Sequence, residues 1–393
     1  MTLQYDRRRT TTTRKLAINR LKERAPLDGT AVDRFLARHE VPIVEGPYCT
    51  FLFRGQSDEV FLVQRIVGLP DRIAMRRLWG TDLWYVVLEL PEGSRIEYQI
   101  EVHHNDHHER INDPLNPKVS HSPLGSVSVC FAQGYTTPDW ALPDPDARPG
   151  ELLPELVVPS RALGRDCQVS LYLPARFRRT ASYPLLLIHD GDDFLRYASA
   201  KTVLDNLIHR LDVAPIVAAF LNPHDRLSEY ANSAAHARFV TKELLPRLEA
   251  DLPLAGSRSG RCLLGSSFGA VASLAAAYRS PDVYGSLVLL SGSFVFTDIG
   301  NDHGGGPVFD PVVKFVNRYR ARPRRVADRA FVSCGIYEPL IVPNRSMVHT
   351  FESTGMEVYY VEARAGHSWE NWRDRMRDAL SYVFPGPQKF VYE

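Results

Sequence analysis

The sequence is poor in cysteine, and the spacing of the few that occur excludes two kinds of site. Five cysteines are scattered over 393 residues, and no two of them form a C-x-x-C pair. Structural zinc sites and disulfide frameworks need cysteines at close, regular spacing. We therefore expect no metal and no disulfide framework, and a cytoplasmic location, where thiols stay reduced.

The sequence also lacks an excess of charge of one sign and any long apolar run. Its 47 basic residues nearly balance its 46 acidic ones, so neither a nucleic-acid partner nor a membrane surface is indicated. No stretch is long and apolar enough to cross a bilayer, and the basic start "MTLQYDRRRTTTTRK" has no apolar secretion segment after it. A small-molecule ligand is the expected partner, and a homo-oligomer is compatible with the sequence.

What is present divides the chain into segments of different character. Residues 1–40 predict a solvated tail and a short helix over 27–40, with Thr30 as its N-cap. Over 41–135, short alternating runs such as "LWYVVLEL" and "RIEYQIEV" between turn-forming residues predict a small β-sandwich. Five prolines between 138 and 154 predict a linker over 136–155.

The remainder, 156–393, predicts a different architecture. Continuous apolar strands such as "YPLLLIHDG" and "GSLVLLSGS" alternate with helical segments, which indicates a mostly parallel sheet covered by helices on both faces. The first two strands are candidates for an antiparallel pair. The expected helices span 198–211, 232–250, 268–279, 344–353 and 369–382.

One turn in this second part carries a chemical signature. "GSSFG", Gly265 to Gly269, matches G-x-S-x-G between a buried strand and a helix, with Ser267 at the nucleophile position. The glycines fit a turn too sharp for a β-carbon at the flanking positions. The sequence therefore predicts a nucleophile elbow.

A serine hydroxyl needs a base within hydrogen-bond reach and an acid that orients the base. His367 follows the last strand directly, in "VEARAGHSW", and is the candidate base. Glu338, in "CGIYEP" just beyond the penultimate strand, is the candidate acid. Three aspartates after the preceding strand stay open as alternatives: Asp298, Asp302 and Asp310.

Charge on the carbonyl oxygen of a substrate needs two hydrogen-bond donors. The backbone N–H of Phe268 is the first candidate, and the second is expected from Gly191 or Asp192 in the loop after "LLLIHDG". Trp369, Ser293 and Phe294 are candidates for the wall of the substrate pocket.

Two features of the first part have a functional and a structural interpretation. The histidines of "EVHHNDHHER", residues 101–110, suggest a metal site, but the flanking strands favour a solvated hairpin tip. Trp79, Trp84 and Tyr85 suggest a carbohydrate platform, although alternating packing should bury at least one of them.

From about Pro154 to Pro385 the chain resembles the putative-esterase group of α/β-hydrolases. The resemblance rests on six segments in order: "LLLIHDG", "RLSEY", "GSSFGA", "SGSF", "CGIYEP" and "AGHSWENWR". Enterochelin (ferric siderophore) esterases are similar in their Gly-x-x-Glu-Pro acid loop. Residues 40–132 are similar to the N-terminal early-set, Ig-like sandwich of those enzymes.

The resemblance implies an α/β-hydrolase fold, a triad of Ser267, Glu338 and His367, and no cofactor. It also implies that Arg226 and Glu229 tie down a loop and take no part in the chemistry. The chain departs from the pattern at "DGDDFL", where an aromatic residue is usual soon after Asp-Gly, and at Ala270, where a second glycine is usual.

Together these features predict a serine carboxylester hydrolase that works through an acyl-enzyme on a small or medium ester. A siderophore trilactone esterase is the alternative within the same chemistry, and transfer of the acyl group to an alcohol is a variant of it. A carbohydrate-binding protein with an inactive hydrolase scaffold is the alternative from another class.

Overall fold

A computed structural model describes residues 16–24, 27–297 and 305–387. The chain divides into two compact units, which are described separately: unit 1 is Met1–Thr136 with Arg364–Gly366, and unit 2 is Thr137–Ala363 with His367–Glu393. The run "RRRTTTTRK", predicted to be a solvated tail, lies outside the described residues.

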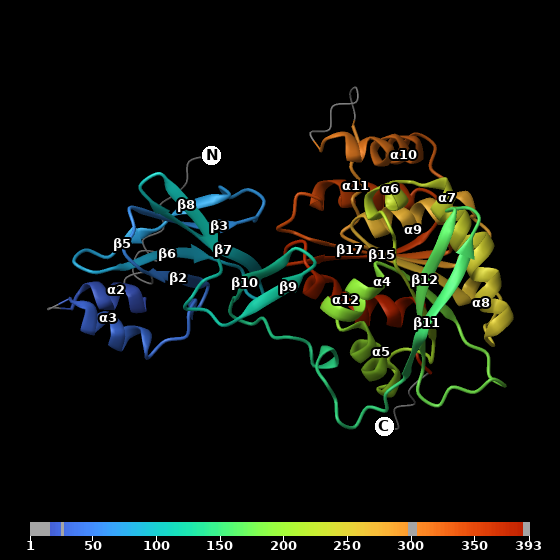
Figure 1. Ribbon diagram of the computed structural model, residues 1–393, viewed down its shortest axis with the longest axis horizontal. Coiled ribbons are helices and arrows are strands. Elements are labelled where there is room, and N and C mark those ends of the chain that lie inside the picture. The colour runs from blue at the N-terminus through green and yellow to red at the C-terminus, as the bar shows by residue number, and fades with distance from the viewer. Residues whose placement is uncertain (1–15, 25–26, 298–304, 388–393) are drawn as a thin grey trace. The chain divides into compact units, whose positions relative to one another are not determined.

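Unit 1 contains two antiparallel sheets, with strand orders β1-β2-β6-β5 and β4-β3-β7-β10-β9, and β8 pairs with β7 (Figure 1). Phe51 of β2 and Tyr98 of β7 meet edge to face at 4.8 Å, so the two sheets pack on each other. The strands are β1 (Ile43–Glu45), β2 (Tyr48–Arg54), β3 (Glu59–Gln64), β4 (Arg72–Ala74), β5 (Arg76–Arg77), β6 (Leu83–Glu89), β7 (Arg95–His104), β8 (His107–Ile111), β9 (Val119–Ser122) and β10 (Gly125–Phe131).

Two short helices, α2 (Ala17–Lys22) and α3 (Gly29–Leu36), share a core with the first sheet of unit 1. The expected helix 27–40 is α3, but its N-cap is Asp28, whose carboxylate accepts the N–H of Ala31 at 2.9 Å. The choice of Thr30 as the cap was wrong because Thr30 already lies inside the first turn. Helix α2 was not anticipated.

The histidine-rich segment is the hairpin between β7 and β8, with His104 opposite His107 and Asn105 at positive φ in the turn. His103 contacts the buried carboxylate of Glu101 at 2.8 Å, and Arg72 and Arg110 pair with the same carboxylate. Throughout the described ranges, no three His, Cys, Asp or Glu side chains are grouped as metal ligands.

Residues 137–155 of the stretch predicted as a linker group with unit 2. They contain a 3-10 turn, η1 (Asp139–Ala141), and the start of the long edge strand β11 (Glu151–Ser160). Asn206 donates to the carbonyls of Trp140 and Leu142 and holds the stretch against unit 2. Pro154 fits in β11 because the pairing with β12 is irregular between Leu153 and Leu156, where no N–H is required.

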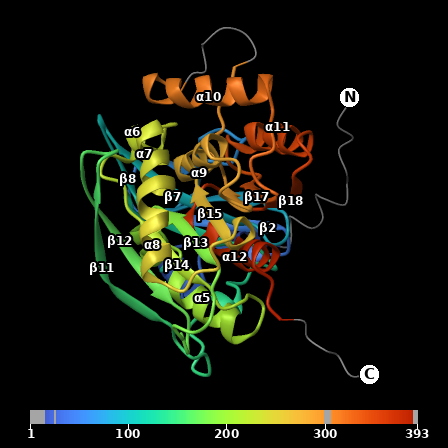
Figure 2. The same ribbon diagram turned by 90° about the vertical axis from the view of Figure 1, so that its right-hand side faces the viewer.

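Unit 2 is built on a mixed eight-stranded sheet of order β11-β12-β14-β13-β15-β16-β17-β18 (Figures 1 and 2). The β11–β12 and β12–β14 pairs are antiparallel, and the pairs from β14 onward are parallel. The strands after β11 are β12 (Arg165–Leu173), β13 (Leu185–His189), β14 (Val217–Leu221), β15 (Arg261–Ser266), β16 (Ser286–Leu290), β17 (Arg329–Gly335) and β18 (Glu357–Ala363).

Alternate residues of the central strands enter different cores, as the period of a strand requires. Leu185 and Leu187 of β13 pack with α8, α9, α10 and α11, whereas Leu186 and Ile188 pack with α4, α5 and α12. The helices are α4 (Gly191–Tyr197), α5 (Ala200–His209), α6 (Arg226–Tyr230), α7 (Ala234–Arg238), α8 (Leu245–Asp251), α9 (Phe268–Arg279), α10 (Asp310–Ala321), α11 (Ile341–Glu352) and α12 (Trp369–Val383). A π-helical segment, η2 (Phe239–Leu244), joins α7 to α8, and η3 (Arg258–Gly260) and η4 (Pro307–Phe309) are single 3-10 turns.

The five expected helices of unit 2 correspond to α5, the α7-η2-α8 run, α9, α11 and α12. Helices α4, α6 and α10 were not expected. No helix within the described ranges is long and apolar enough to cross a bilayer.

Candidate active site

Ser267 lies on a tight turn between β15 and α9. Its backbone has φ 54° and ψ −120°, a conformation that non-glycine residues rarely adopt. A β-carbon on Gly265 would lie 2.1 Å from the carbonyl oxygen of Gly269, and one on Gly269 would lie 3.2 Å from Asp190. The backbone therefore excludes a side chain at Gly265 and leaves little room for one at Gly269, and it holds a half-buried serine in a strained conformation of the kind found at functional sites.

The two candidate oxyanion donors lie at the first residues of two helices. Phe268 is the first residue of α9, so its N–H has no carbonyl one turn earlier in the helix. Gly191 likewise begins α4, and a β-carbon on it would lie 2.5 Å from that of Phe220, so only glycine fits. The N–H of Asp192 donates to Asn222 at 2.9 Å, which makes Gly191 the better candidate of the two for the second donor.

Glu338 and His367 are brought together from loops that follow β17 and β18. His367 Nδ1 lies 2.5 Å from Glu338 Oε2. The Glu338 side chain is 1% exposed, whereas that of His367 is 36% exposed. A buried carboxylate thus holds one nitrogen of a partly exposed imidazole.

Three donors keep Glu338 ionised although it is buried. Oε1 accepts the hydroxyl of Ser291 at 2.7 Å and the N–H of Gly335 at 2.7 Å, while Oε2 contacts His367. Burial by itself raises the pKa of a carboxyl, but the hydrogen bonds and the charge of His367 outweigh it, and the pKa of Glu338 is lowered.

The end of β16 connects the serine to this acid–base pair. Ser267 N–H donates to the carbonyl of Leu290, and the hydroxyls of Ser267 and Ser293 are 3.1 Å apart. Ser291, which lies between Leu290 and Ser293 in the chain, donates its hydroxyl to Glu338. All three candidate residues therefore lie at the carboxyl ends of the parallel strands, where the loops of such sheets gather.

A network under the turn fixes the loop that carries Gly191. Arg226 donates to both oxygens of the buried Asp190, at 2.7 and 2.8 Å, and the Tyr230 hydroxyl accepts the Asp190 N–H at 3.1 Å. Beside it, His189 and His236 lie 3.1 Å apart. Burial lowers the pKa of His189 to about 3, so His189 is neutral and structural.

Several residues have other roles than the sequence suggested. Phe294 has no exposed surface and packs on Phe351, and Trp369 is buried against Phe194; both belong to the core, which corrects their assignment to the pocket wall. Ser293 contacts the candidate nucleophile.

Of the four candidate acids, Glu338 is the one that contacts His367. Asp310 begins α10, and Asp298 and Asp302 lie outside the described residues. Sequence reasoning missed Ser291, whose hydroxyl donates to Glu338, because no motif marks this contact between residues 47 positions apart.

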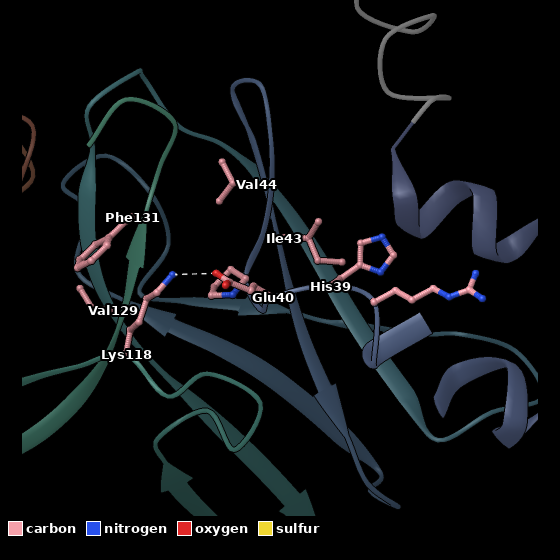
Figure 3. A pocket seen from close by; sticks show the side chains of 9 residues that line it. His39, Glu40, Ile43, Val44, Lys118, Val129 and Phe131 are labelled. Carbon is pink, nitrogen blue, oxygen red and sulfur yellow. Dashed lines mark hydrogen bonds and ion pairs between the residues drawn. The ribbon is translucent and has the colours of Figure 1, made fainter. Parts of the chain in front are cut away.

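A separate pocket of about 300 Å³ lies in unit 1 (Figure 3). Lys118 closes one side through an ion pair with Glu40 at 3.3 Å, and Phe131 and Ile43 contribute apolar surface. In the same unit, Trp79 is 92% exposed, while Trp84 is buried and donates to the Gly55 carbonyl; burial of Trp84 removes it from any carbohydrate platform.

Residues 160–383 match the family model described as "Putative esterase". The chain belongs to this family. The predicted recognition and the predicted class of enzyme, an esterase, are thereby confirmed.

Individual relatives extend the likeness over most of the chain. The iron(III) enterobactin esterase of Escherichia coli O6:H1 (strain CFT073) is 22% identical over 369 residues, which are 84% of this chain and 90% of that protein. The iron(III) salmochelin esterase of the same strain is 21% identical over 360 residues, 85% and 87% of the two chains.

Solved structures show the same fold. The ferric enterobactin esterase of Salmonella typhimurium superposes with a TM-score of 0.71 at 20% identity and covers 86% of this chain and 93% of its own. A ferulic acid esterase from Anaeromyces mucronatus has a TM-score of 0.51 at 16% identity and covers 63% and 96%. The α/β-hydrolase-like fold of this esterase follows from these likenesses and from the strand order of unit 2.

Proposed function

We propose that this esterase cleaves carboxylic esters through an acyl-enzyme on Ser267, with His367 as base and Glu338 as the acid that orients it. Ser267 Oγ attacks the carbonyl carbon while His367 Nε2 takes the hydroxyl proton. The N–H groups of Phe268 and Gly191 stabilise the oxyanion. Collapse expels the alcohol, which receives the proton from His367. Water then attacks the acyl-enzyme, His367 takes and returns a proton, and the acid leaves.

The contact between His367 and Glu338 is the observation that carries this proposal. An ionised carboxylate only accepts hydrogen bonds, so His367 must carry its proton on Nδ1. In the neutral ring with its proton on Nδ1, Nε2 is unprotonated and can act as a base. The strained backbone of Ser267 and the glycines beside it support the assignment of the nucleophile.

The test compares Ser267→Ala with Ser266→Ala on p-nitrophenyl esters of increasing chain length. Ser266 is the neighbour in the same turn, has a fully buried side chain, and makes no hydrogen bond through its hydroxyl within the described structure. We expect Ser267→Ala to lower kcat/KM at least about a thousandfold and Ser266→Ala to stay near wild type. Activity that survives in folded Ser267→Ala would refute the mechanism.

A siderophore trilactone is the second candidate substrate, and the extent of the likeness supports it. The ferric enterobactin esterase structure covers 86% of this chain, which is more than unit 2 alone, whereas the ferulic acid esterase covers 63%. Much of unit 1 is therefore shared with the former. If the trilactone is the substrate, ferric enterobactin will be cleaved with a higher kcat/KM than p-nitrophenyl butyrate; cleavage of methyl ferulate alone would reject it.

We also infer that unit 1 is an early-set β-sandwich and that the protein is cytoplasmic. The contact between its two antiparallel sheets supports the first inference. The second is supported by the five cysteines, which are all free and buried.

A further inference from the structure

Trp372 contacts His367 directly and is linked to Glu338 through Ser291. It lies in the first turn of α12, and its indole Nε1–H donates to the hydroxyl of Ser291 at 3.0 Å. Ser291 donates in turn to Glu338 Oε1 at 2.7 Å. The Trp372 ring also meets the His367 ring edge to face, with centroids 5.0 Å apart and an angle of 89° between the planes.

The direction of the two hydrogen bonds follows from the chemistry of the groups. An indole N–H can only donate, so the Ser291 oxygen accepts from Trp372. An ionised carboxylate can only accept, so the single hydroxyl proton of Ser291 points to Glu338. Donation from Trp372 polarises the hydroxyl and makes it a stronger donor. The indole therefore acts on the carboxylate through Ser291.

The residue that supplies this hydroxyl, Ser291, has an unfavourable backbone conformation. Ser291 has φ +46°, which a non-glycine residue adopts at a cost, and its side chain is fully buried. Its N–H donates to the Ser333 carbonyl at 2.7 Å, which fixes it at the end of β16. Glycine would suit this backbone better but would supply no hydroxyl.

Helix α12 ties the position of Trp372 to that of His367. The residue between His367 and the helix is Ser368, the N-cap, whose hydroxyl accepts the Asn371 N–H and whose carbonyl accepts the Trp372 N–H at 3.2 Å. One buried side chain, that of Trp372, therefore makes both the ring contact with His367 and the hydrogen bond to Ser291. The first turn of α12 fixes its distance from His367 along the chain.

We propose that Trp372 and Ser291 are positioning residues of this esterase, which together hold Glu338 and His367 in the geometry needed for proton transfer. The inference rests on the proposed roles of Glu338 and His367. Neither Trp372 nor Ser291 exchanges a proton with the substrate. Their contribution lies in the orientation of the carboxylate and the imidazole, so it should appear in kcat rather than in KM.

The test uses four variants of the full-length protein. Ser291→Ala and Ser291→Gly both remove the hydroxyl, but only the glycine also relieves the backbone. Trp372→Phe keeps an aromatic ring and removes the N–H. Trp140→Phe is the matched control, because Trp140 packs against the same core as Trp372 and its buried indole N–H has no hydrogen-bond partner in the described structure.

We expect both Ser291 variants to lower kcat about ten- to a hundredfold with little change in KM, although their melting temperatures differ. Trp372→Phe should lower kcat about three- to tenfold, and the double variant Trp372→Phe/Ser291→Ala should be no slower than Ser291→Ala, since the N–H acts through the hydroxyl. Losses that multiply in the double variant, or an unchanged kcat in either Ser291 variant, would overturn the proposal.

A second readout needs no substrate. The proton shared by His367 Nδ1 and Glu338 should give a far-downfield proton NMR resonance, which should move upfield or broaden in Ser291→Ala and Trp372→Phe and stay in place in Trp140→Phe. An unshifted resonance in the first two variants would overturn the proposal. Its failure is separate from that of the catalytic mechanism, which falls only if Ser267→Ala or His367→Ala retains activity.

Discussion

Replacement of Glu338 by glutamine tests the proposed orientation of His367 with a change of a single heavy atom. In the wild type, Glu338 Oε1 accepts from Ser291 and Gly335, and Oε2 contacts His367 Nδ1. In Glu338→Gln the amide oxygen can keep the first two donors. The amide NH₂ must then face His367, and it can only donate.

This exchange reverses the hydrogen bond to the imidazole. His367 Nδ1 becomes the acceptor, so the ring carries its proton on Nε2 and cannot take the proton of Ser267. From the cost of a wrong tautomer we expect kcat to fall about 10³- to 10⁴-fold. The fold should survive, because two of the three hydrogen bonds remain and the buried charge is gone; we expect the free energy of unfolding to change by about 2 kcal/mol or less.

The assay is p-nitrophenyl ester hydrolysis, with urea unfolding as the measure of stability. Glu338→Asp is the control: it keeps the charge and the tautomer but withdraws the carboxylate by one methylene, so it should lose less activity than Glu338→Gln. A Glu338→Gln enzyme within tenfold of wild type, with wild-type stability, would refute the reasoning.

The lowered pKa of Glu338 adds a pH dependence. A carboxyl whose pKa is lower in the folded state stabilises the fold above its ordinary pKa of about 4.5, and this stabilisation is lost as the pH falls through the lowered value. Glu338→Gln should therefore lose less stability than the wild type below pH about 4.5.

Three further perturbations probe the turn and its surroundings. Gly265→Ala places a β-carbon 2.1 Å from a backbone atom that cannot rotate away, so urea unfolding should show a loss of about 3 kcal/mol or more in the free energy of unfolding. Gly269→Ala, whose nearest contact is 3.2 Å, should lose about 1 kcal/mol, and the reverse order would contradict the geometry. His189, with its pKa lowered to about 3, stays neutral in the folded state, whereas the same residue is protonated in the unfolded chain below pH about 6.5. The free energy of unfolding should therefore fall by about 2 kcal/mol between pH 7 and 5, and it should depend less on pH in a His189→Asn variant. Arg226→Gln leaves the buried Asp190 unpaired and should lower both the melting temperature and kcat. Addition of Asp190→Asn should restore part of the melting temperature, and a double variant that melts lower than Arg226→Gln would argue against the ion pair.

The sequence by itself determined the elements whose chemistry is local. Gly265 and Gly269 could be interpreted because a sharp turn excludes a β-carbon wherever it occurs, and the predicted helix 268–279 is α9 as observed. Glu338 and His367 were predictable as candidates because each follows a buried strand, and the carboxyl ends of parallel strands meet at one edge of a sheet.

Long-range packing decided the rest. The prolines of 136–155 have the composition of a linker, but contacts with Asn206 and pairing with β12 make them part of unit 2. Trp369 and Trp372 are equivalent in the sequence, two indoles three residues apart behind the candidate base.

Only the tertiary structure separates them: both are buried in one core and Trp369 packs edge to face on Phe194, but the indole N–H of Trp372 donates to Ser291, 81 residues earlier in the chain. A hydrogen bond between residues so far apart depends on how the whole sheet and its helices pack, and no local pattern of residues records it.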